Sequence, residues 1–291
     1  MRHESRRRAA PQTPPVVPGV PVRLGERVWR LTCTNAGLMT GPGTNSYFVG
    51  EADHWLLIDP GPLDATHMQA LLSAAPGPIR QILVTHTHAD HSPAAAALQQ
   101  RTGAQLLGRL SLHRHGQDLS FVPDRELCDG ELISLGAQGG LRALHTPGHA
   151  SNHLCYLLEP ELLLFTGDHI IQGSTVVIDP PDGNMSDYLA SLKRLLVTDL
   201  NALAPGHGTL MSAPHEALCA LLAHRLNRES RVFEALSPDA PAPLGRLVKR
   251  VYSDVPRGLH ALAERSLLAH LLKLETDGRA RRDGQQWLAR P

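Results

Sequence analysis

Long apolar runs are missing from this 291-residue sequence. No stretch approaches the roughly 18 consecutive apolar residues that a membrane-spanning helix needs, so we expect no membrane partner. Net charge is also missing, because 28 Lys and Arg balance 28 Asp and Glu. With 42% apolar and 19% charged residues, the composition is that of a globular protein rather than a disordered one. The length allows one large domain with a small appendage.

Cysteine is scarce and scattered. Cys33, Cys128, Cys155 and Cys219 lie far apart and form no C-x-x-C pair. No hydrophobic leader is present in residues 1–18, so we interpret the four as reduced thiols of a cytoplasmic protein. The start is rich in Arg, but PQTPPVVPGVP follows and blocks a long amphipathic helix, which predicts a flexible tail over residues 1–20.

The balanced charge is unevenly distributed. Residues 1–24 hold five Arg and one acid, and residues 225–291 hold 13 basic and 8 acidic residues. The middle, 25–224, is left with 10 basic and 19 acidic residues. An acidic body with a basic end piece is compatible with an anionic partner and equally with a solvated basic surface.

Strand-length apolar runs recur along the first two thirds of the chain, and most end in Gly, Pro or Asp turns. Helical patterns lie between some of them. In SPAAAALQQRTG, Ser92 is the expected N-cap, Pro93 the first helical residue and Gly103 the residue beyond the end. SDYLASLKRLLV repeats apolar residues at helical spacing. This interleaving predicts a layered α/β domain over residues 21–212.

The pattern changes after residue 212. A long helix is expected first, then two helices, LGRLVKRVY and LHALAERSLLAHLLKLETDG, joined by a turn. Asp283-Gly284 predicts a closing hairpin. This order describes a winged helix-turn-helix, so residues 213–291 are predicted to form a helix plus a small winged-helix domain.

Potential metal ligands are crowded into THTHADHS, residues 85–92. His86 and His88 are two residues apart, so an extended segment projects both to one side. Asp90 and His91 would then turn toward a second ion. Four strand ends supply further candidates beside glycines or turns: Asp59 in LIDPG, His149 in HTPGH, Asp168 in FTGDH and His207 in APGHG.

In this order, THTHADH, TPGH, TGD and APGHG resemble the motifs of the metallo-β-lactamase superfamily over roughly residues 25–210. The resemblance implies an α/β fold, an αββα sandwich with a two-metal site at one sheet edge. MTGPGTNSYFVG, the segment after Asp168 and the C-terminal region are similar to the β-lactamase-like endoribonuclease subfamily, which carries a small C-terminal winged-helix domain.

The resemblance also implies roles for the ligands. It assigns the first ion to His86, His88 and His149 and the second ion to Asp90, His91 and His207. Asp168 would bridge the ions, and Asp59 would orient the histidine loop. Imidazole and carboxylate ligands suit two divalent ions, with Zn²⁺ the first choice and Fe or Mn the alternatives. The expected reaction is hydrolysis by a metal-bridging hydroxide, with Asp90 as the catalytic proton acceptor and donor.

The fold does not name the substrate. The first hypothesis is cleavage of single-stranded RNA, with phosphates held by basic residues of the C-terminal region: Arg246, Lys249, Arg250, Arg279, Arg281 and Arg282. Aromatic residues make up only 4% of the chain, and Tyr252 and Trp287 are the sole nearby candidates for base stacking. The alternative is hydrolysis of an acyl thioester on a carrier protein or glutathione, and other small-molecule esters stay open.

Two further alternatives concern the whole chain. A binding module with a structural metal needs only one closed ligand shell, whereas seven ligands are available here. Sequence-specific DNA binding is not expected, because RGLHALAERSLLAHLL, in the place of a recognition helix, is Ala- and Leu-rich and suited to packing. The winged helix could instead cap the site, dock a carrier or pair two subunits in a homodimer.

Overall fold

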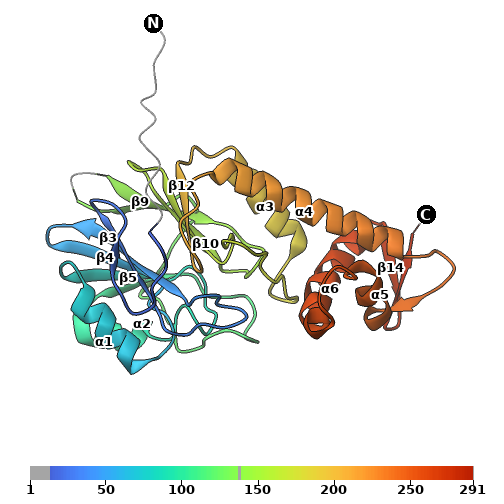
Figure 1. The fold of residues 1–291 in the computed structure, drawn as a ribbon, viewed down its shortest axis with the longest axis horizontal. Helices are drawn as coiled ribbons and strands as arrows, with labels where there is room; N and C mark the ends of the chain where they lie inside the picture. Colours follow the sequence, from blue (N-terminus) through green and yellow to red (C-terminus); the bar gives the residue numbers. More distant parts are fainter. Residues whose placement is uncertain (1–13, 137–138, 291) are drawn as a thin grey trace, which may run out of the picture.

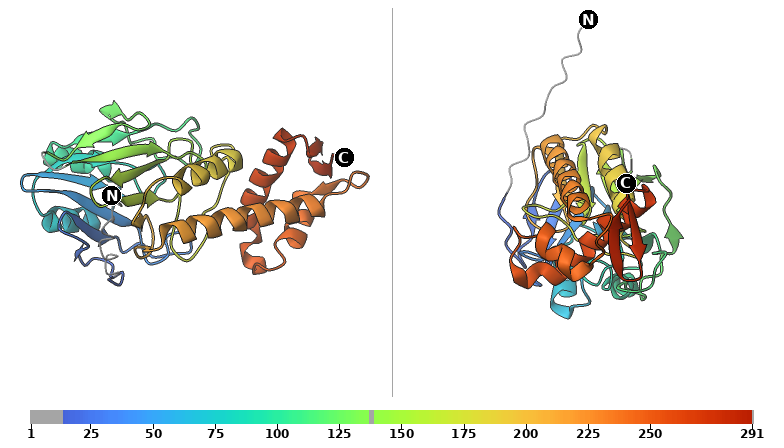
Figure 2. Two further views of the ribbon diagram at one scale, coloured as in Figure 1. Left: turned by 90° about the horizontal axis from the view of Figure 1, so that it is seen from above. Right: turned by 90° about the vertical axis from the view of Figure 1, so that its right-hand side faces the viewer.

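The computed structural model describes residues 14–136 and 139–290. Two β-sheets pack face to face with helices on both outer faces, and a long helix leads from this sandwich to a small C-terminal domain (Figures 1 and 2). Most of the predicted flexible tail, residues 1–13, lies outside the described residues. Within the rest of that segment, the carbonyls of Pro14 and Pro15 accept hydrogen bonds from Arg30.

The first sheet has seven strands in the order β1-β2-β3-β4-β5-β6-β7. Its strands are Val22–Arg23 (β1), Val28–Thr32 (β2), Asn45–Glu51 (β3), His54–Ile58 (β4), Ile79–Leu83 (β5), Gln105–Gly108 (β6) and Arg125–Glu126 (β7). β4 and β5 are parallel neighbours, with Leu57 opposite Ile82. Their outer face is covered by α1 (Ala65–Ala74) and α2 (Ala95–Thr102) (Figure 1).

The second sheet has five strands in the order β12-β11-β10-β9-β8. Its strands are Leu132–Ser134 (β8), Gly140–His145 (β9), Leu154–Leu158 (β10), Leu163–Gly167 (β11) and Ala202–Pro205 (β12). Here β11 and β12 are the parallel pair. α3 (Met185–Leu196) and the first half of α4 (Pro214–Ala235) cover its outer face. The predicted αββα sandwich is confirmed.

Strand β10 shows how the sandwich forms its core. All five residues are buried, and they alternate between two clusters. Leu154, Tyr156 and Leu158 face the space between the sheets, whereas Cys155 and Leu157 face α3 and α4. A strand covered on both faces is continuously apolar, which explains the uninterrupted run LCYLL.

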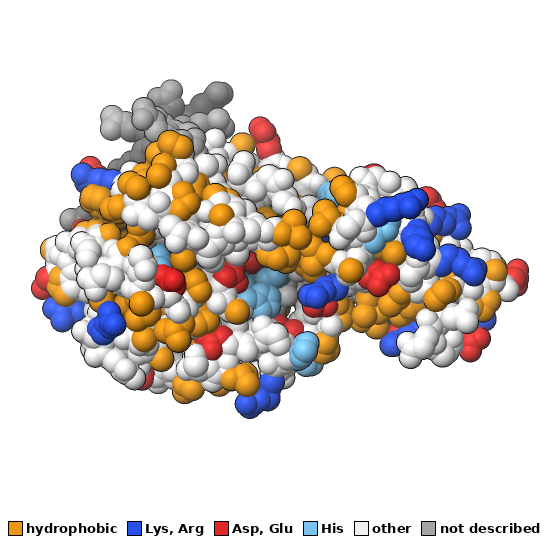
Figure 3. All heavy atoms as spheres, turned by 60° about the horizontal axis from the view of Figure 1, so that its bottom comes forward, with side chains coloured by type: hydrophobic (Ala, Val, Ile, Leu, Met, Phe, Trp, Pro, Cys, Tyr) orange, Lys and Arg blue, Asp and Glu red, His pale blue; other side chains and the backbone are white. Residues whose placement is uncertain are grey.

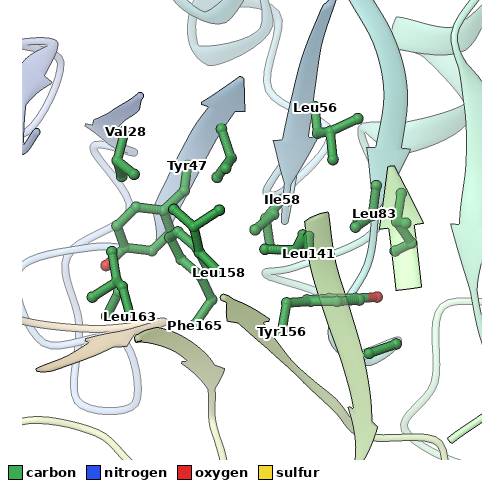
Figure 4. Close-up of a cluster of buried hydrophobic side chains, with 14 of the residues drawn as sticks. Val28, Tyr47, Leu56, Ile58, Leu83, Leu141, Tyr156, Leu158, Leu163 and Phe165 are labelled. Carbon is green, nitrogen blue, oxygen red and sulfur yellow. The ribbon is translucent and has the colours of Figure 1, made fainter. Parts of the chain in front are cut away.

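Aromatic side chains join the sheets at the centre of the sandwich. The ring centroids of Tyr47 from β3 and Phe165 from β11 lie 5.0 Å apart, and Figure 4 shows them meeting between the sheets. The Tyr156 hydroxyl crosses the same interface and donates to the carbonyl of Val84 at 2.7 Å. This bond holds the start of the loop that contains His86 against the opposite sheet.

Helix α2 begins later than the sequence suggested. Its N-cap is Ala94, so the predicted Ser92 cap is wrong. The Ser92 hydroxyl instead donates to Asp118, 26 residues away, at 2.6 Å. The C-terminal end is as expected: Gly103 adopts the left-handed conformation that favours glycine, and its N–H bonds to the carbonyl of Gln99.

The C-terminal domain contains α5 (Leu244–Val251), a 3₁₀ turn (Arg257–Leu259), α6 (His260–Thr276) and the strands Ala242–Pro243 (β13), Ala280–Asp283 (β14) and Gln286–Ala289 (β15). β14 and β15 form the predicted hairpin, with Asp283 opposite Gln286. α6 buries one face, which includes Leu267, Leu271 and Leu274. The second half of α4 joins this domain's core.

Two further expectations concern the chemistry of the chain. All four cysteines are free thiols. Cys155 packs in the core, as predicted, and burial raises the pKa of its thiol to about 12. None of the helices in the described part of the chain combines the length and apolar character that crossing a bilayer requires.

Candidate metal centre

The seven predicted ligands come together where two pairs of parallel strands end. Residues 84–92 follow β5, Asp168 follows β11, and His207 lies two residues after β12. His149 is carried by the turn between β9 and β10. Parallel neighbours end at the same sheet edge, so the two sheets deliver these loops to one place. Three groups of these side chains could hold a metal ion.

The first group is His86, His88 and His149. His88 Nδ1 lies 3.0 Å from His86 Nε2 and 3.0 Å from His149 Nε2. Zinc–nitrogen bonds of about 2.0 Å in a tetrahedral site place ligand nitrogens about 3.3 Å apart, close to this spacing. Burial and the neighbouring His149 lower the pKa of His88 to about 4, so the imidazole is neutral, as a metal ligand must be.

Another group is Asp90, His91 and His207, called the second group below, and the remaining one combines Asp168 with His86 and His91. Asp90 Oδ2 is 3.4 Å from His91 Nε2 and 3.3 Å from His207 Nε2. Asp168 Oδ1 is 3.4 Å and 3.2 Å from the same two nitrogens. Asp168 Oδ2 lies 3.8 Å from His149 Nε2 of the first group. Asp168 therefore stands between the two groups.

Hydrogen bonds at Nδ1 point four of the five histidines at the centre through Nε2. His86 Nδ1 lies 3.0 Å from Thr85 Oγ1, and His91 Nδ1 lies 2.9 Å from Asp59 Oδ2. His149 Nδ1 lies 2.8 Å from the Val177 carbonyl oxygen, and His207 Nδ1 lies 3.1 Å from the Gly43 carbonyl oxygen. The two carbonyls and the Asp59 carboxylate can only accept the Nδ1 proton. The Thr85 hydroxyl accepts it as well, since it donates its own proton to Asp59. An accepted Nδ1–H leaves a lone pair on Nε2 for a cation.

The carboxylates of the second group favour positive charge on or beside its two imidazoles. Burial lowers the pKa of His207, but the neighbouring carboxylates of Asp168 and Asp90 raise it to about 10. Burial opposes the protonation of His91, but the negative charges of Asp90, Asp168 and Asp59 favour it and raise the pKa of the imidazole. Without a metal, protons on these imidazoles balance the carboxylates. A divalent cation can replace them.

Unsatisfied buried atoms mark the same place. Among the described residues, His91 Nε2, His207 Nε2 and Asp168 Oδ1 are buried without a hydrogen-bond partner. Such atoms are costly unless something else compensates them. A cation held by imidazole and carboxylate would compensate all three, so the donor set fits a metal site.

Several residues that shape the centre were not singled out from the sequence. Asn45 donates from Nδ2 to the carbonyls of Pro205 and Gly208 and so fixes the turn that carries His207. Thr44 reaches Asp90 Oδ2 with its hydroxyl at 3.5 Å. The segment PGTN, which combines turn residues with two side chains able to hydrogen-bond, was the available signal.

The residues expected to contact RNA fare differently. Tyr252 and Trp287, the two nearby candidates for base stacking, are only 7% and 2% exposed, so neither ring offers a face to a base. Arg282 is paired with Glu275 and lies over the Trp287 ring. The basic candidates that are exposed on the C-terminal domain are Arg246, Lys249, Arg250, Arg279, Arg281 and Arg282.

Figure 3 shows one face of the molecule with histidine side chains at the bottom of a hollow near its middle. Acidic side chains lie at the edge of this hollow, and lysine and arginine gather over the C-terminal end. Asp90 and Asp168 keep 26% and 14% of their side chains exposed, so the centre is open to a substrate from solvent.

Comparison with known proteins matches residues 39–207 to the metallo-β-lactamase superfamily and residues 244–287 to the β-lactamase-associated winged-helix domain. The chain is 30% identical over 271 residues to an atrochrysone carboxyl ACP thioesterase of Aspergillus chevalieri, covering 88% of this chain and 83% of that protein. It is 28% identical over 285 residues to the β-lactamase-like protein 2 homolog of Drosophila melanogaster, covering 91% and 93%. A β-lactamase domain protein from Burkholderia ambifaria shares the fold with a TM-score of 0.80 at 20% identity, covering 94% and 95%.

Proposed function

This chain belongs to the metallo-β-lactamase superfamily, and from that premise we propose that it is a two-metal hydrolase of carrier-bound acyl thioesters. The observation that carries the two-metal part is the place of Asp168. Its Oδ1 lies 3.2 Å from His207 Nε2 and its Oδ2 lies 3.8 Å from His149 Nε2, so one carboxylate faces both ligand groups.

The proposed ligand sets follow from these groups. The first ion takes His86, His88 and His149, and the second takes Asp90, His91 and His207. Asp168 bridges them. The ligands are nitrogen and oxygen without thiolate, which suits Zn²⁺ and also admits Fe or Mn. Two such ions would lower the pKa of a bound water toward neutrality and polarise the carbonyl under attack.

Asp90 is the proposed catalytic group. Burial alone would raise its pKa, but the neighbouring imidazoles of His91 and His207 lower the pKa by more, so the carboxylate is ionised and can accept a proton. The Thr44 hydroxyl donates to Oδ2 and limits the rotation of the carboxylate. A group positioned in this way can take a proton from water and return it to the leaving thiolate.

Two observations favour a thioester over RNA. The Aspergillus chevalieri relative, similar over most of both chains, is named as a thioesterase of an acyl carrier protein. The two aromatic residues near the basic C-terminal surface are buried, which removes the stacking platform that single-strand binding generally uses. Exposed Arg246, Lys249 and Arg281 suit an acidic carrier protein.

RNA cleavage remains the second candidate because the same basic residues could hold phosphates. The side-by-side test uses metal-replete protein, an acyl N-acetylcysteamine thioester and a fluorogenic single-stranded RNA. We expect thioester turnover by the wild type and a loss of about 100-fold or more in kcat for Asp90→Asn, since the amide cannot accept the proton.

Asp53→Asn serves as the matched control, because this aspartate is exposed in the turn between β3 and β4. It should keep wild-type turnover. The thioesterase proposal fails if the wild type cleaves the RNA but not the thioester and the Asp90→Asn variant no longer cleaves the RNA. The endoribonuclease function would then take its place.

A further inference from the structure

The bond that orients His149 comes from a segment that the C-terminal region holds in place. His149 Nδ1 donates to the Val177 carbonyl at 2.8 Å. Val177 lies in the connection between β11 and α3, outside every strand and helix. We infer that Arg225 and Ser266, on the two helices that pack against this connection, are positioning residues for the first metal ion and act through Val177 on His149.

The groups on either side of the Val177 carbonyl are bound by these two helices. Arg225 of α4 donates from Nη2 to the Val176 carbonyl at 2.5 Å. Ser266 of α6 accepts from the Ile178 N–H through Oγ at 3.2 Å. Thus the backbone is fixed immediately before and immediately after the carbonyl that meets His149.

Burial makes both bonds effective. Arg225 is 3% exposed and Ser266 is 7% exposed, while Val176 and Ile178 are 6% and 0% exposed. Water cannot easily replace either partner, so loss of one side chain leaves a buried backbone group unsatisfied and the segment free to shift. By contrast, the nearby Arg265–Asp179 pair is exposed on both sides and should contribute little.

Arg225 makes a second contact with the surroundings of the centre. Its guanidinium lies 5.1 Å from the ring centroid of Tyr188, and the Tyr188 hydroxyl donates to the carbonyl of His169 at 3.0 Å. His169 directly follows Asp168. The same arginine therefore contacts the middle of the connection between β11 and α3 directly, and packs on the tyrosine that bonds to its start.

The inference rests on the proposed two-metal site, and its test reads metal binding rather than turnover. Purified apoprotein is titrated with Co²⁺ against a competing chelator, for the wild type, Arg225→Met and Ser266→Ala. We expect one of the two binding steps to weaken by about 10-fold in each variant, the range found when a partner of a metal ligand is removed. In Ser266→Ala the other step should keep its wild-type affinity.

Arg228→Met is the matched control. Arg228 is also a buried arginine of α4, one turn from Arg225, but it bonds the Val251 carbonyl and Asp254 within the C-terminal domain. It should lower the melting temperature and leave both Co²⁺ affinities unchanged. Arg225→Lys, which keeps a charged donor, should recover part of the affinity that Arg225→Met loses.

A double-mutant cycle tests the route through His149. In a His149→Ala background, Ser266→Ala should cause no further loss of Co²⁺ affinity, because the residue on which it acts is gone. The inference is overturned by unchanged Co²⁺ affinity in Arg225→Met and Ser266→Ala, by an equal loss in Arg228→Met, or by full additivity in the cycle. Failure of the wild type to bind two ions would instead refute the proposed two-metal site.

Discussion

Asp168→Ala should abolish turnover and lower the metal content of the purified protein. The carboxylate faces both ligand sets, with Oδ1 3.4 Å from His91 Nε2 and Oδ2 3.8 Å from His149 Nε2. Its removal takes a ligand from both proposed ions and removes the negative charge that would reduce the repulsion between the two cations. We expect kcat to fall by about 1000-fold or more, judged from the loss of a single electrostatic group in an active site.

Inductively coupled plasma mass spectrometry measures the metal content. The thioester assay described above measures kcat. Asp187→Ala is the control, since Asp187 is exposed in the first turn of α3. It should retain two ions per chain and wild-type turnover. Two ions per chain together with wild-type turnover in Asp168→Ala would contradict the bridging role.

Asp59→Asn should weaken both the fold and the metal centre. The carboxylate accepts three hydrogen bonds, from Thr85 N at 2.7 Å, from Thr85 Oγ1 at 2.8 Å and from His91 Nδ1 at 2.9 Å. Asparagine has one acceptor oxygen, so its NH₂ group would face donors in a site where the residue is only 2% exposed. Asp59 has a φ of 51°, which asparagine also tolerates, so the backbone need not change.

We expect the free energy of unfolding to fall by about 2–3 kcal/mol, the cost of buried polar groups left without partners. Metal affinity should fall by about 10-fold to 100-fold, because His91 loses the acceptor that orients it. Urea denaturation of the apoprotein and metal titration measure the two separately. Asp64→Asn is the control, since this exposed N-cap of α1 can be replaced by asparagine with little loss. An unchanged unfolding free energy in Asp59→Asn would refute the argument.

The sequence predicted a layered α/β domain because the signals for strands, helices and turns are local, and the family resemblance implied the sandwich. Strands such as LCYLL are continuous apolar runs bounded by turns, and β10 is buried on both faces as such a run implies. The hairpin at β14 and β15 follows in the same way from Asp283-Gly284. The Ser92 cap failed because its hydroxyl is bonded to Asp118, a partner that local spacing cannot indicate.

The candidate ligands were readable for a similar reason. His86, His88, Asp90 and His91 lie within six residues, and the remaining three stand beside glycines at strand ends. The burial of Tyr252 and Trp287 could not be predicted, because an aromatic side chain near basic residues has the same sequence pattern whether it is exposed or buried. Only the packing of α4, α5, α6 and β15 shows that both belong to the C-terminal core.

What the sequence by itself determined is therefore the interleaving of strands and helices and the candidate ligand side chains, since both depend on spacing along the chain. The order of the layers and the role of each ligand were implied by the family resemblance. Tertiary structure alone decided which atom of each ligand faces the centre. The carbonyls of Gly43 and Val177 orient His207 and His149 from 164 and 28 residues away. Every residue has a backbone carbonyl, so no residue type indicates this role in the sequence. Only the folded chain brings these two carbonyls within hydrogen-bonding distance of His207 and His149.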